Sequence, residues 1–204
     1  MPIQDGLEEQ IPFASRAESA RISRSFLREL WDLAQAGSFG LSETEFELVL
    51  AAAGTKYNFG LPKGEIPTSS QCGTFYQGLH LKELALAHGC ALGRDVAWQY
   101  FVKQYQTALR LVAVGITGSS SLGEDLAGAL YSELFGLTER DGVRRSPLAS
   151  YSGRGPLMGW LRATLAQRHV DHHRRTHRET PLEGDDFAAE VAAPATPLPS
   201  KIER

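Results

Sequence analysis

Six arginines are concentrated in residues 153–178, where their spacing would allow them to bind a polyanion. The stretch reads GRGPLMGWLRATLAQRHVDHHRRTHR and contains a single acid, Asp171. Clustered arginines on one helix are typical of a surface that binds nucleic acid. Basic residues also gather at helix C-termini, where they complement the helix dipole, so a plain solvated face remains an alternative. The six are Arg154, Arg162, Arg168, Arg174, Arg175 and Arg178.

An apolar stripe at the start of this stretch predicts how the arginines are positioned. At about 100° per residue, five side chains fall on one side of a helix and can pack on a core. After Leu165 the stripe ends and Arg168 occupies the same line. Trp160 lies on the stripe, which favours core packing over stacking on a base. The stripe consists of Leu157, Trp160, Leu161, Thr164 and Leu165.

Histidines in the same stretch raise the alternative of a metal site. His169, His173 and His177 are four residues apart and so share one helical face. Two histidines at this spacing can bind zinc, and catalytic zinc usually takes three protein ligands. The glutamate of an HExxH motif is absent, however, and neighbouring arginines would repel a dication. We therefore expect no metal and no cofactor, and a His-rich metal-binding protein is the less favoured reading.

No pattern in the chain predicts catalysis. The serines at 119–121 and Ser152 lack the sequence context of a nucleophile elbow. No pair of carboxylates lies beside a histidine in a spacing that suggests a general base. We therefore expect the chain not to be an enzyme.

Composition describes an ordinary globular protein with a local basic segment. The chain has 204 residues, 42% of them hydrophobic, and a net charge of -3. This length suits one full domain plus a small one. Cys72 and Cys90 match neither a metal motif nor a disulfide framework, so we expect reduced thiols. We find no signal-peptide pattern and no apolar run of membrane-spanning length, and expect a cytoplasmic protein without a membrane partner.

Helical periodicity recurs along the chain without sustained period-two alternation, which predicts an all-α fold. Capping boxes at Ser15 with Glu18 and at Ser42 with Glu45 begin two helices of a small helical extension. Acids at Glu124 and Asp125 begin a later helix, in a first turn that suits its dipole. Further helices are expected at 72–88, 95–112 and 155–178, with polar connections at 56–70 and 137–155. The predicted organisation is a flexible N-terminus at 1–14, the extension at 15–70, a helical domain at 71–178 and a Pro/Ala-rich linker or tail at 179–204.

Three motifs from Leu81 to Arg178 resemble region two of sigma-70 family transcription initiation factors, most closely the extracytoplasmic-function (ECF) group. LKELALAHGCALGRDVAWQYFVKQY resembles that group's opening helices, and LGEDLAGALYSELF resembles its second helix. WLRATLAQRHVDHHRR aligns without a gap to the usual Trp-Leu-x-x-Ile-Ala-x-Asn-x-x-Ile-Asp-x-x-Arg-Arg. The three motifs occur in the family's order and spacing. The fold that this implies is a sigma region two-like helical bundle preceded by the extension.

The resemblance implies a function in transcription initiation as a subunit of bacterial RNA polymerase. The helix at 124–135 would dock on the clamp helices of the polymerase largest subunit, through Glu124, Asp125, Leu126, Leu130 and Glu133. The connection at 137–155 would hold the loop that captures a flipped base of the minus-ten promoter element, and the helix at 155–178 would line the separating strands. The implied partners are core RNA polymerase, promoter DNA in melted or single-stranded form, and an anti-sigma factor. The implied DNA-binding residues are Tyr151, Ser152, Arg154, Arg162, Gln167, Arg168, His172, Arg174, Arg175 and Arg178.

The chain also departs from the family pattern. Gly128-Ala129 replaces the usual Gln-Glu of the second helix, and Gln167 replaces the usual Asn of the DNA helix. The C-terminal helix-turn-helix domain that reads the minus-thirty-five element is not in this sequence, so we expect either a truncated or a single-domain factor. The alternative reading is a helical adaptor that binds an acidic partner without DNA.

Overall fold

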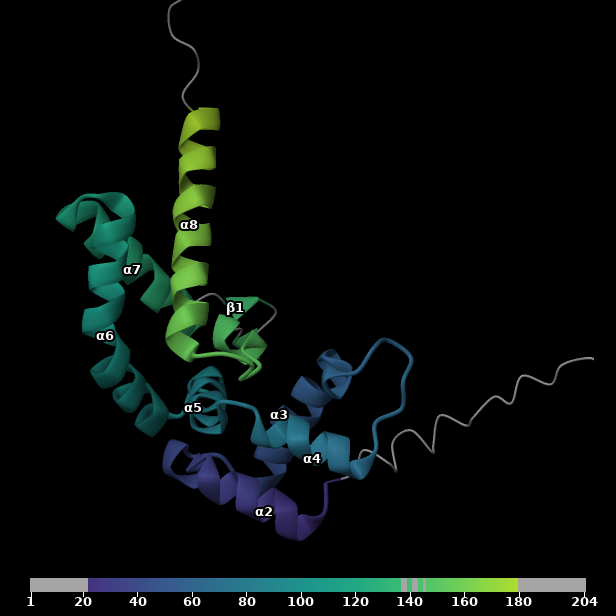
Figure 1. The fold of residues 1–204 in the computed structure, drawn as a ribbon. Helices are drawn as coiled ribbons and strands as arrows, with labels where there is room; N and C mark the ends of the chain where they lie inside the picture. Colours follow the sequence, from purple (N-terminus) through teal and green to yellow (C-terminus); the bar gives the residue numbers. More distant parts are fainter. Residues whose placement is uncertain (1–21, 137–138, 141–142, 145, 180–204) are drawn as a thin grey trace, which may run out of the picture. The chain divides into compact units, whose positions relative to one another are not determined.

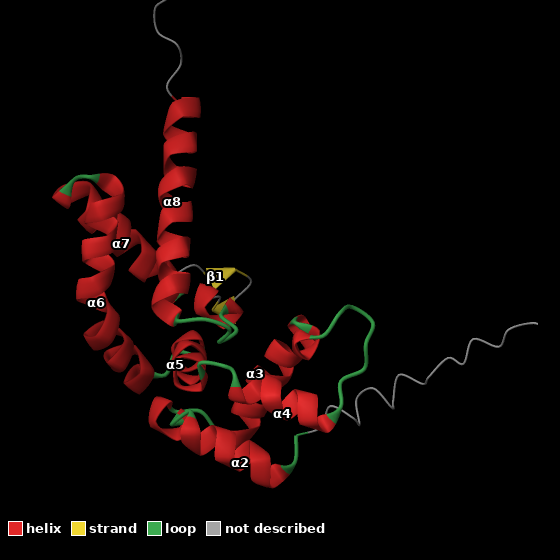
Figure 2. Cartoon of the chain, in the orientation of Figure 1, coloured by secondary structure: helices red, strands yellow, loops and turns green. Residues whose placement is uncertain are grey.

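The described part of the chain forms seven α-helices, which confirms the all-α prediction (Figures 1 and 2). The computed structural model describes residues 22–136, 139–140, 143–144 and 146–179, and only the backbone at 139–140, 143–144, 173 and 175–179. Its β structure there is one antiparallel pair of two-residue strands, β1 (Glu139–Arg140) and β2 (Val143–Arg144). The helices are α2 (Arg24–Leu33), α3 (Glu43–Lys56), α4 (Ser69–Gln77), α5 (Leu81–Ala91), α6 (Asp95–Thr117), α7 (Ser120–Phe135) and α8 (Leu157–Glu179), with 3-10 turns η1 (Ala36–Phe39), η2 (Asn58–Gly60) and η3 (Pro147–Ser150).

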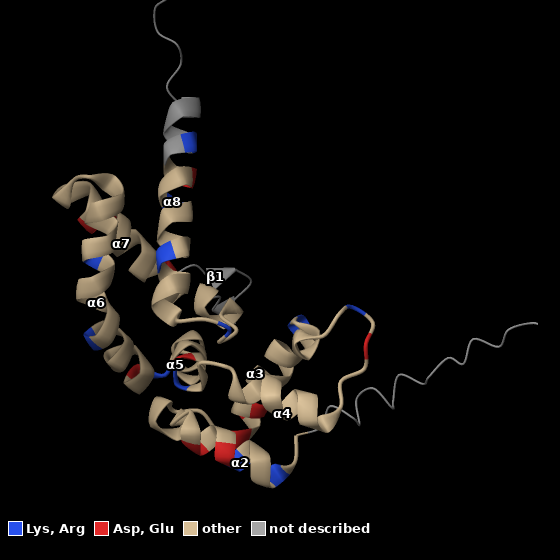
Figure 3. Cartoon of the chain, in the orientation of Figure 1, with Lys and Arg blue, Asp and Glu red and all other residues tan. Residues whose placement is uncertain are grey.

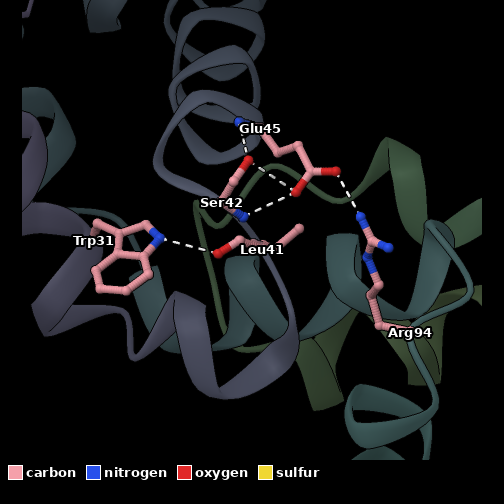
Figure 4. A network of polar contacts seen from close by, with 5 residues as sticks. All are labelled: Trp31, Leu41, Ser42, Glu45 and Arg94. Carbon is pink, nitrogen blue, oxygen red and sulfur yellow. Dashed lines mark hydrogen bonds and ion pairs between the residues drawn. The ribbon is translucent and has the colours of Figure 1, made fainter.

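The capping box predicted at the start of α3 is present, and it also ties α3 to the start of α6 (Figure 4). The Ser42 N–H donates to Glu45 Oε2 at 2.8 Å, and the Glu45 N–H donates to Ser42 Oγ at 3.2 Å. Glu45 Oε1 accepts a further hydrogen bond of 2.7 Å from Arg94, the N-cap residue of α6. One carboxylate thus satisfies a helix terminus and joins the extension to the next helices. The other predicted box, at Ser15, lies outside the described residues.

The prediction of a single helix over residues 72–88 is wrong, because one helix ends at Gly78 and another begins at Leu81. Gly78 is the C-cap of α4, and its N–H donates to the Thr74 and Phe75 carbonyls. His80 has non-helical angles (φ -73°, ψ 69°), and α5 starts at Leu81. A capping box of Thr68 and Gln71 begins α4. The predicted domain boundary at residue 70 therefore falls inside a helix.

α7 also begins earlier than expected. Ser119 is its N-cap, and the Ser119 hydroxyl accepts from the Leu122 N–H at 3.4 Å. Glu124 and Asp125 consequently lie in the second turn, so the expected dipole contribution of these acids to the first turn is wrong. A serine cap satisfies the first turn in their place.

One hydrophobic core joins the extension to the later helices. Leu30, Phe46 and Leu50 of the extension belong to the same cluster as Leu84 and Leu86 of α5. Within the described residues, no gap in this core marks the predicted boundary between 15–70 and 71–178. The chain instead divides after His169, and residues from Val170 onward are a second unit.

The two cysteines are free thiols, as expected from the sequence. Cys72 and Cys90 are both buried and are not joined in a disulfide. Burial raises the pKa of the Cys72 thiol. Where the structure describes the chain, none of its helices combines the length and apolar character needed to cross a bilayer.

Candidate nucleic-acid interface

The apolar stripe of α8 packs on the core as predicted. Leu157, Leu161 and Leu165 are fully buried. Trp160 is half-buried, and its ring meets the Tyr151 ring edge to face at a centroid distance of 6.1 Å. The environment of Trp160 therefore supports core packing and not stacking on a base. Because the stripe faces inward, Arg162 and Gln167 lie on exposed parts of the helix.

Arg168 is paired with a carboxylate. Its Nη2 donates to Glu133 Oε1, which forms an ion pair between α8 and α7. Both side chains are partly buried. Glu133 was expected to face polymerase and Arg168 to face DNA, but in this structure they satisfy each other. The positive charge of Arg168 is thus largely neutralised in the folded chain.

The remaining basic positions of α8 belong to the second unit. His172 and Arg174 are exposed there, and Figure 3 shows basic positions at intervals along the described length of α8. The side chains of Arg175 and Arg178 lie outside the described residues. Their predicted DNA contacts stay predictions.

Tyr151 lies inside the protein, with only 4% of its surface exposed. Its hydroxyl donates to the Gly155 carbonyl at 2.6 Å and also lies 3.2 Å from Glu83 Oε2. Burial raises the pKa of Tyr151, and the nearby Glu83 charge adds to this effect. The expected contact of Tyr151 with a base does not fit this environment. Its ring packs instead against Trp160, near the start of α8.

Glu83 of α5 binds the segments that position the loop and α8. Its Oε2 accepts the Leu157 N–H, at the first residue of α8, at 2.8 Å. The Tyr151 hydroxyl contacts the same oxygen, and the Tyr105 hydroxyl of α6 donates to Oε1 at 3.2 Å. A carboxylate at a helix N-terminus is stabilised by the helix dipole and satisfies an N–H that has no partner within the helix. Glu83 therefore fixes where α8 begins.

The backbone of the loop before α8 runs along α5. The Gly153 carbonyl accepts from the His80 N–H at 2.8 Å, and the Tyr151 carbonyl lies 3.1 Å from His88 Nε2. Because a carbonyl only accepts, His88 Nε2 carries the hydrogen. Gly153 has φ +74°, and a Cβ there would lie 3.4 Å from Leu84. The left-handed angle explains why glycine stands at this turn.

The sequence did not reveal the contacts that the extension makes with this loop. The Ser152 hydroxyl donates to the Tyr57 hydroxyl at 3.1 Å, and the Arg154 guanidinium lies 4.7 Å from the centre of the Tyr57 ring. Lys56 Nζ lies 5.5 Å from the same ring and donates to the Ser150 carbonyl at 3.4 Å. The hydrogen bond from Ser152 lowers the pKa of Tyr57, and the Lys56 and Arg154 charges add to it. No local signal marks Lys56 or Tyr57, because their partners lie far along the chain.

The predicted polymerase-binding residues occupy different environments on α7. Asp125 is exposed, Leu126 is half-buried, and Leu130 has only 1% of its surface exposed. Leu130 therefore stabilises the core and is not available to a partner, which corrects its assignment to the docking face. Glu124 pairs across the surface with Arg110 of α6. Among the five predicted docking residues, only Asp125 is an exposed acid that forms none of the ion pairs found in the described part of the chain.

Two grooves flank these elements. The first, of about 300 Å³, lies between α6 and the start of α7, and the strongly exposed Leu111 lines it. The second, of about 620 Å³, lies between α3, the end of α5 and η3. The second groove is mainly apolar and is lined by Glu45, Leu48, Val49, His88, Ala91, Leu92, Ser146, Ala149 and Ser150.

The structure offers no support for a metal site in the part that it describes. Among those side chains, no group of three or more His, Cys, Asp or Glu residues could hold a metal ion. The side chains of His173 and His177, two of the three histidines in the predicted pattern, lie outside the described residues.

No protein-family model, no curated protein and no solved structure matches this chain.

Proposed function

We propose that this chain is a sigma-type initiation factor that binds core RNA polymerase through α7 and binds the melted minus-ten strand through α8 and the loop before it. One observation carries the proposal. The loop before α8 contacts α5, α8 and the extension, and these contacts place the exposed Arg154 three residues before the start of a basic helix. Phosphate contacts of this kind position a strand, while neighbouring loop residues contact its bases.

Two further features support the proposal. The three motifs that resemble sigma region two fall on helices: the first on α5 and α6, the second on α7 and the third on α8. Arg162 and Arg154 are both exposed, and among the described residues neither pairs with a carboxylate. Exposed cations without a carboxylate partner can exchange their counterions for phosphates.

The polymerase half of the proposal predicts a role for Asp125. Because Asp125 is exposed, changing it to Arg should leave folding intact and abolish binding to core polymerase. Gly128 and Ala129, exposed one turn after Asp125, place no large side chain on that side of it, while the exposed Leu122 lies one turn before it. The matched control is Glu47→Arg, which reverses the charge of an exposed acid inside α3 that forms none of the ion pairs among the described residues.

The DNA half is tested by fluorescence anisotropy with matched duplex, bubble and single-stranded promoter templates, with and without core polymerase. We expect weak duplex binding, tighter binding to the bubble, and a gain in apparent affinity when core polymerase holds the factor beside the strand.

Normal core binding by Asp125→Arg would contradict the docking assignment. Salt-independent binding, or no binding to any of the DNAs, would contradict the DNA assignment and favour an adaptor for an acidic protein.

A further inference from the structure

We propose that Lys56 and Tyr57, from the extension that precedes the sigma-like helices, form part of the surface that binds single-stranded DNA. Lys56 would contact phosphate, and Tyr57 would act as a positioning residue for Arg154. This inference rests on the proposed function and deepens it. The resemblance begins at Leu81, so it assigns no role to either residue.

The first step of the argument is charge. Lys56 and Arg154 are exposed, and their cationic groups lie within 5.5 Å of the centre of one tyrosine ring. Among the described residues, neither forms an ion pair with a carboxylate, whereas Arg94, Arg110 and Arg168 each do. Two cations are therefore held together at the surface without a neutralising acid. Such a pair favours a bound anion.

The second step is geometry. An exposed arginine samples many rotamers, and a ligand that immobilises it must offset that loss of entropy. Here the Arg154 guanidinium already lies 4.7 Å from the centre of the Tyr57 ring. The Tyr57 hydroxyl is itself held by Ser152, two residues before Arg154. Tyr57 thus restricts Arg154 before any ligand arrives.

The third step concerns the class of ligand. The class of ligand follows from the proposed function, in which a single strand binds along α8, because exposed cations such as Lys56 and Arg154 follow the backbone of such a strand. The cluster also adjoins the start of α8, three residues after Arg154, so one strand could contact both.

The experiment measures binding of the full chain to a fluorescent single-stranded oligonucleotide and a bubble template at several salt concentrations. The variants are Lys56→Gln, Tyr57→Phe, Tyr57→Leu, Arg154→Gln and the double change Tyr57→Leu with Arg154→Gln. The chain offers a matched control, because Lys82 Nζ lies 5.5 Å from the centre of the exposed Tyr100 ring. Lys82→Gln and Tyr100→Leu therefore remove an equivalent cation and ring elsewhere.

We expect Lys56→Gln to flatten the salt dependence by about 0.7 units, the value for one phosphate contact on a single strand. Tyr57→Leu should weaken binding about twofold to fivefold, the range for a cation–π contact at an exposed site. That loss should disappear in the Arg154→Gln background, because Tyr57 acts through Arg154. Tyr57→Phe, which keeps the ring, should bind more tightly than Tyr57→Leu.

Two results would overturn the inference while leaving the proposed function intact. One is a wild-type chain that binds the bubble while Lys56→Gln and Tyr57→Leu behave like the Lys82 and Tyr100 controls. The other is an equal loss from Tyr57→Leu with and without Arg154, which would mean a general structural role. If the wild-type chain binds neither DNA, the proposed function itself fails.

Discussion

Arg168 of α8 donates a hydrogen bond to Glu133 of α7, so the helix expected to line DNA is paired with the helix expected to bind polymerase. Both side chains remain partly exposed. The pair therefore contributes little to stability, about 0–1 kcal/mol for such surface contacts. Its larger consequence is electrostatic, because it separates the arginines of α8 into paired and unpaired ones.

This separation predicts unequal effects of two arginines on DNA binding. Arg162→Gln should reduce the salt slope of single-strand binding by about 0.7 units, because it removes a cation that pairs with no carboxylate among the described residues. Arg168→Gln should reduce it less, and Glu133→Gln should tighten binding by releasing Arg168. Anisotropy titrations between low and moderate salt measure all three. Equal slopes for Arg162→Gln and Arg168→Gln would contradict the pairing as a determinant of binding.

Glu83→Gln should destabilise the fold, since the neutral side chain replaces a carboxylate that accepts the Leu157 N–H and the Tyr105 hydroxyl and lies 3.2 Å from the Tyr151 hydroxyl. Hydrogen bonds to charged groups contribute about 1.5–3 kcal/mol, and we expect a loss of this size in the free energy of unfolding. Urea denaturation monitored by circular dichroism measures it. Glu29→Gln, an exposed change on α2, is the control. Similar midpoints for the two variants would argue against a structural role for Glu83.

His88 predicts a pH-dependent loss of stability. Burial lowers the pKa of His88 below its ordinary value of 6.5, so the folded chain holds this ring neutral. Below about pH 6.5 the unfolded chain binds a proton that the folded chain does not, and the free energy of unfolding must fall as the pH falls. His88→Gln keeps a donor for the Tyr151 carbonyl but does not titrate. Its stability should therefore decline less between pH 7.5 and 5.5, values chosen to span the ordinary histidine pKa of about 6.5.

The measurement is the free energy of unfolding in urea at several pH values for both proteins. Glu45 lines the same groove as His88, and its pKa is lowered, chiefly by the hydrogen bond from the Ser42 N–H. Glu45 thus stays charged throughout this range in both proteins and does not alter their difference. Parallel pH profiles would show that His88 titrates alike in the folded and unfolded chains.

Tyr131→Phe should stabilise the protein. The Tyr131 hydroxyl is buried, and among the described residues it has no hydrogen-bond partner. Burial also raises the pKa of Tyr131 to about 12. Leaving a buried polar group unsatisfied costs about 1–3 kcal/mol, so removing the hydroxyl should increase the free energy of unfolding by about 1 kcal/mol.

Thermal and urea unfolding test this expectation against Tyr105→Phe. That control removes a hydroxyl that is bonded to Glu83, and it should therefore lower stability. If Tyr131→Phe lowers stability as much as the control does, the Tyr131 hydroxyl must have a partner in the native protein.

The sequence by itself determined the features that depend on nearby residues. The Ser42–Glu45 capping box, the all-α class and the buried stripe of Leu157, Leu161 and Leu165 could all be predicted, because each follows from spacings within a few turns of one helix. The break between α4 and α5 was missed because apolar residues recur at helical spacing on both sides of Gly78.

Only the tertiary structure decided how the candidate site is assembled. The contacts of Tyr57 with Arg154, Glu133 with Arg168 and Glu83 with the start of α8 join residues that are far apart in the chain. The burial of Tyr151 was likewise not evident, since an aromatic residue in a polar loop has the same sequence context whether its ring faces solvent or the core. Such pairings follow from how the helices pack against one core, and no local pattern of side chains records which distant partner will complete a hydrogen bond or an ion pair.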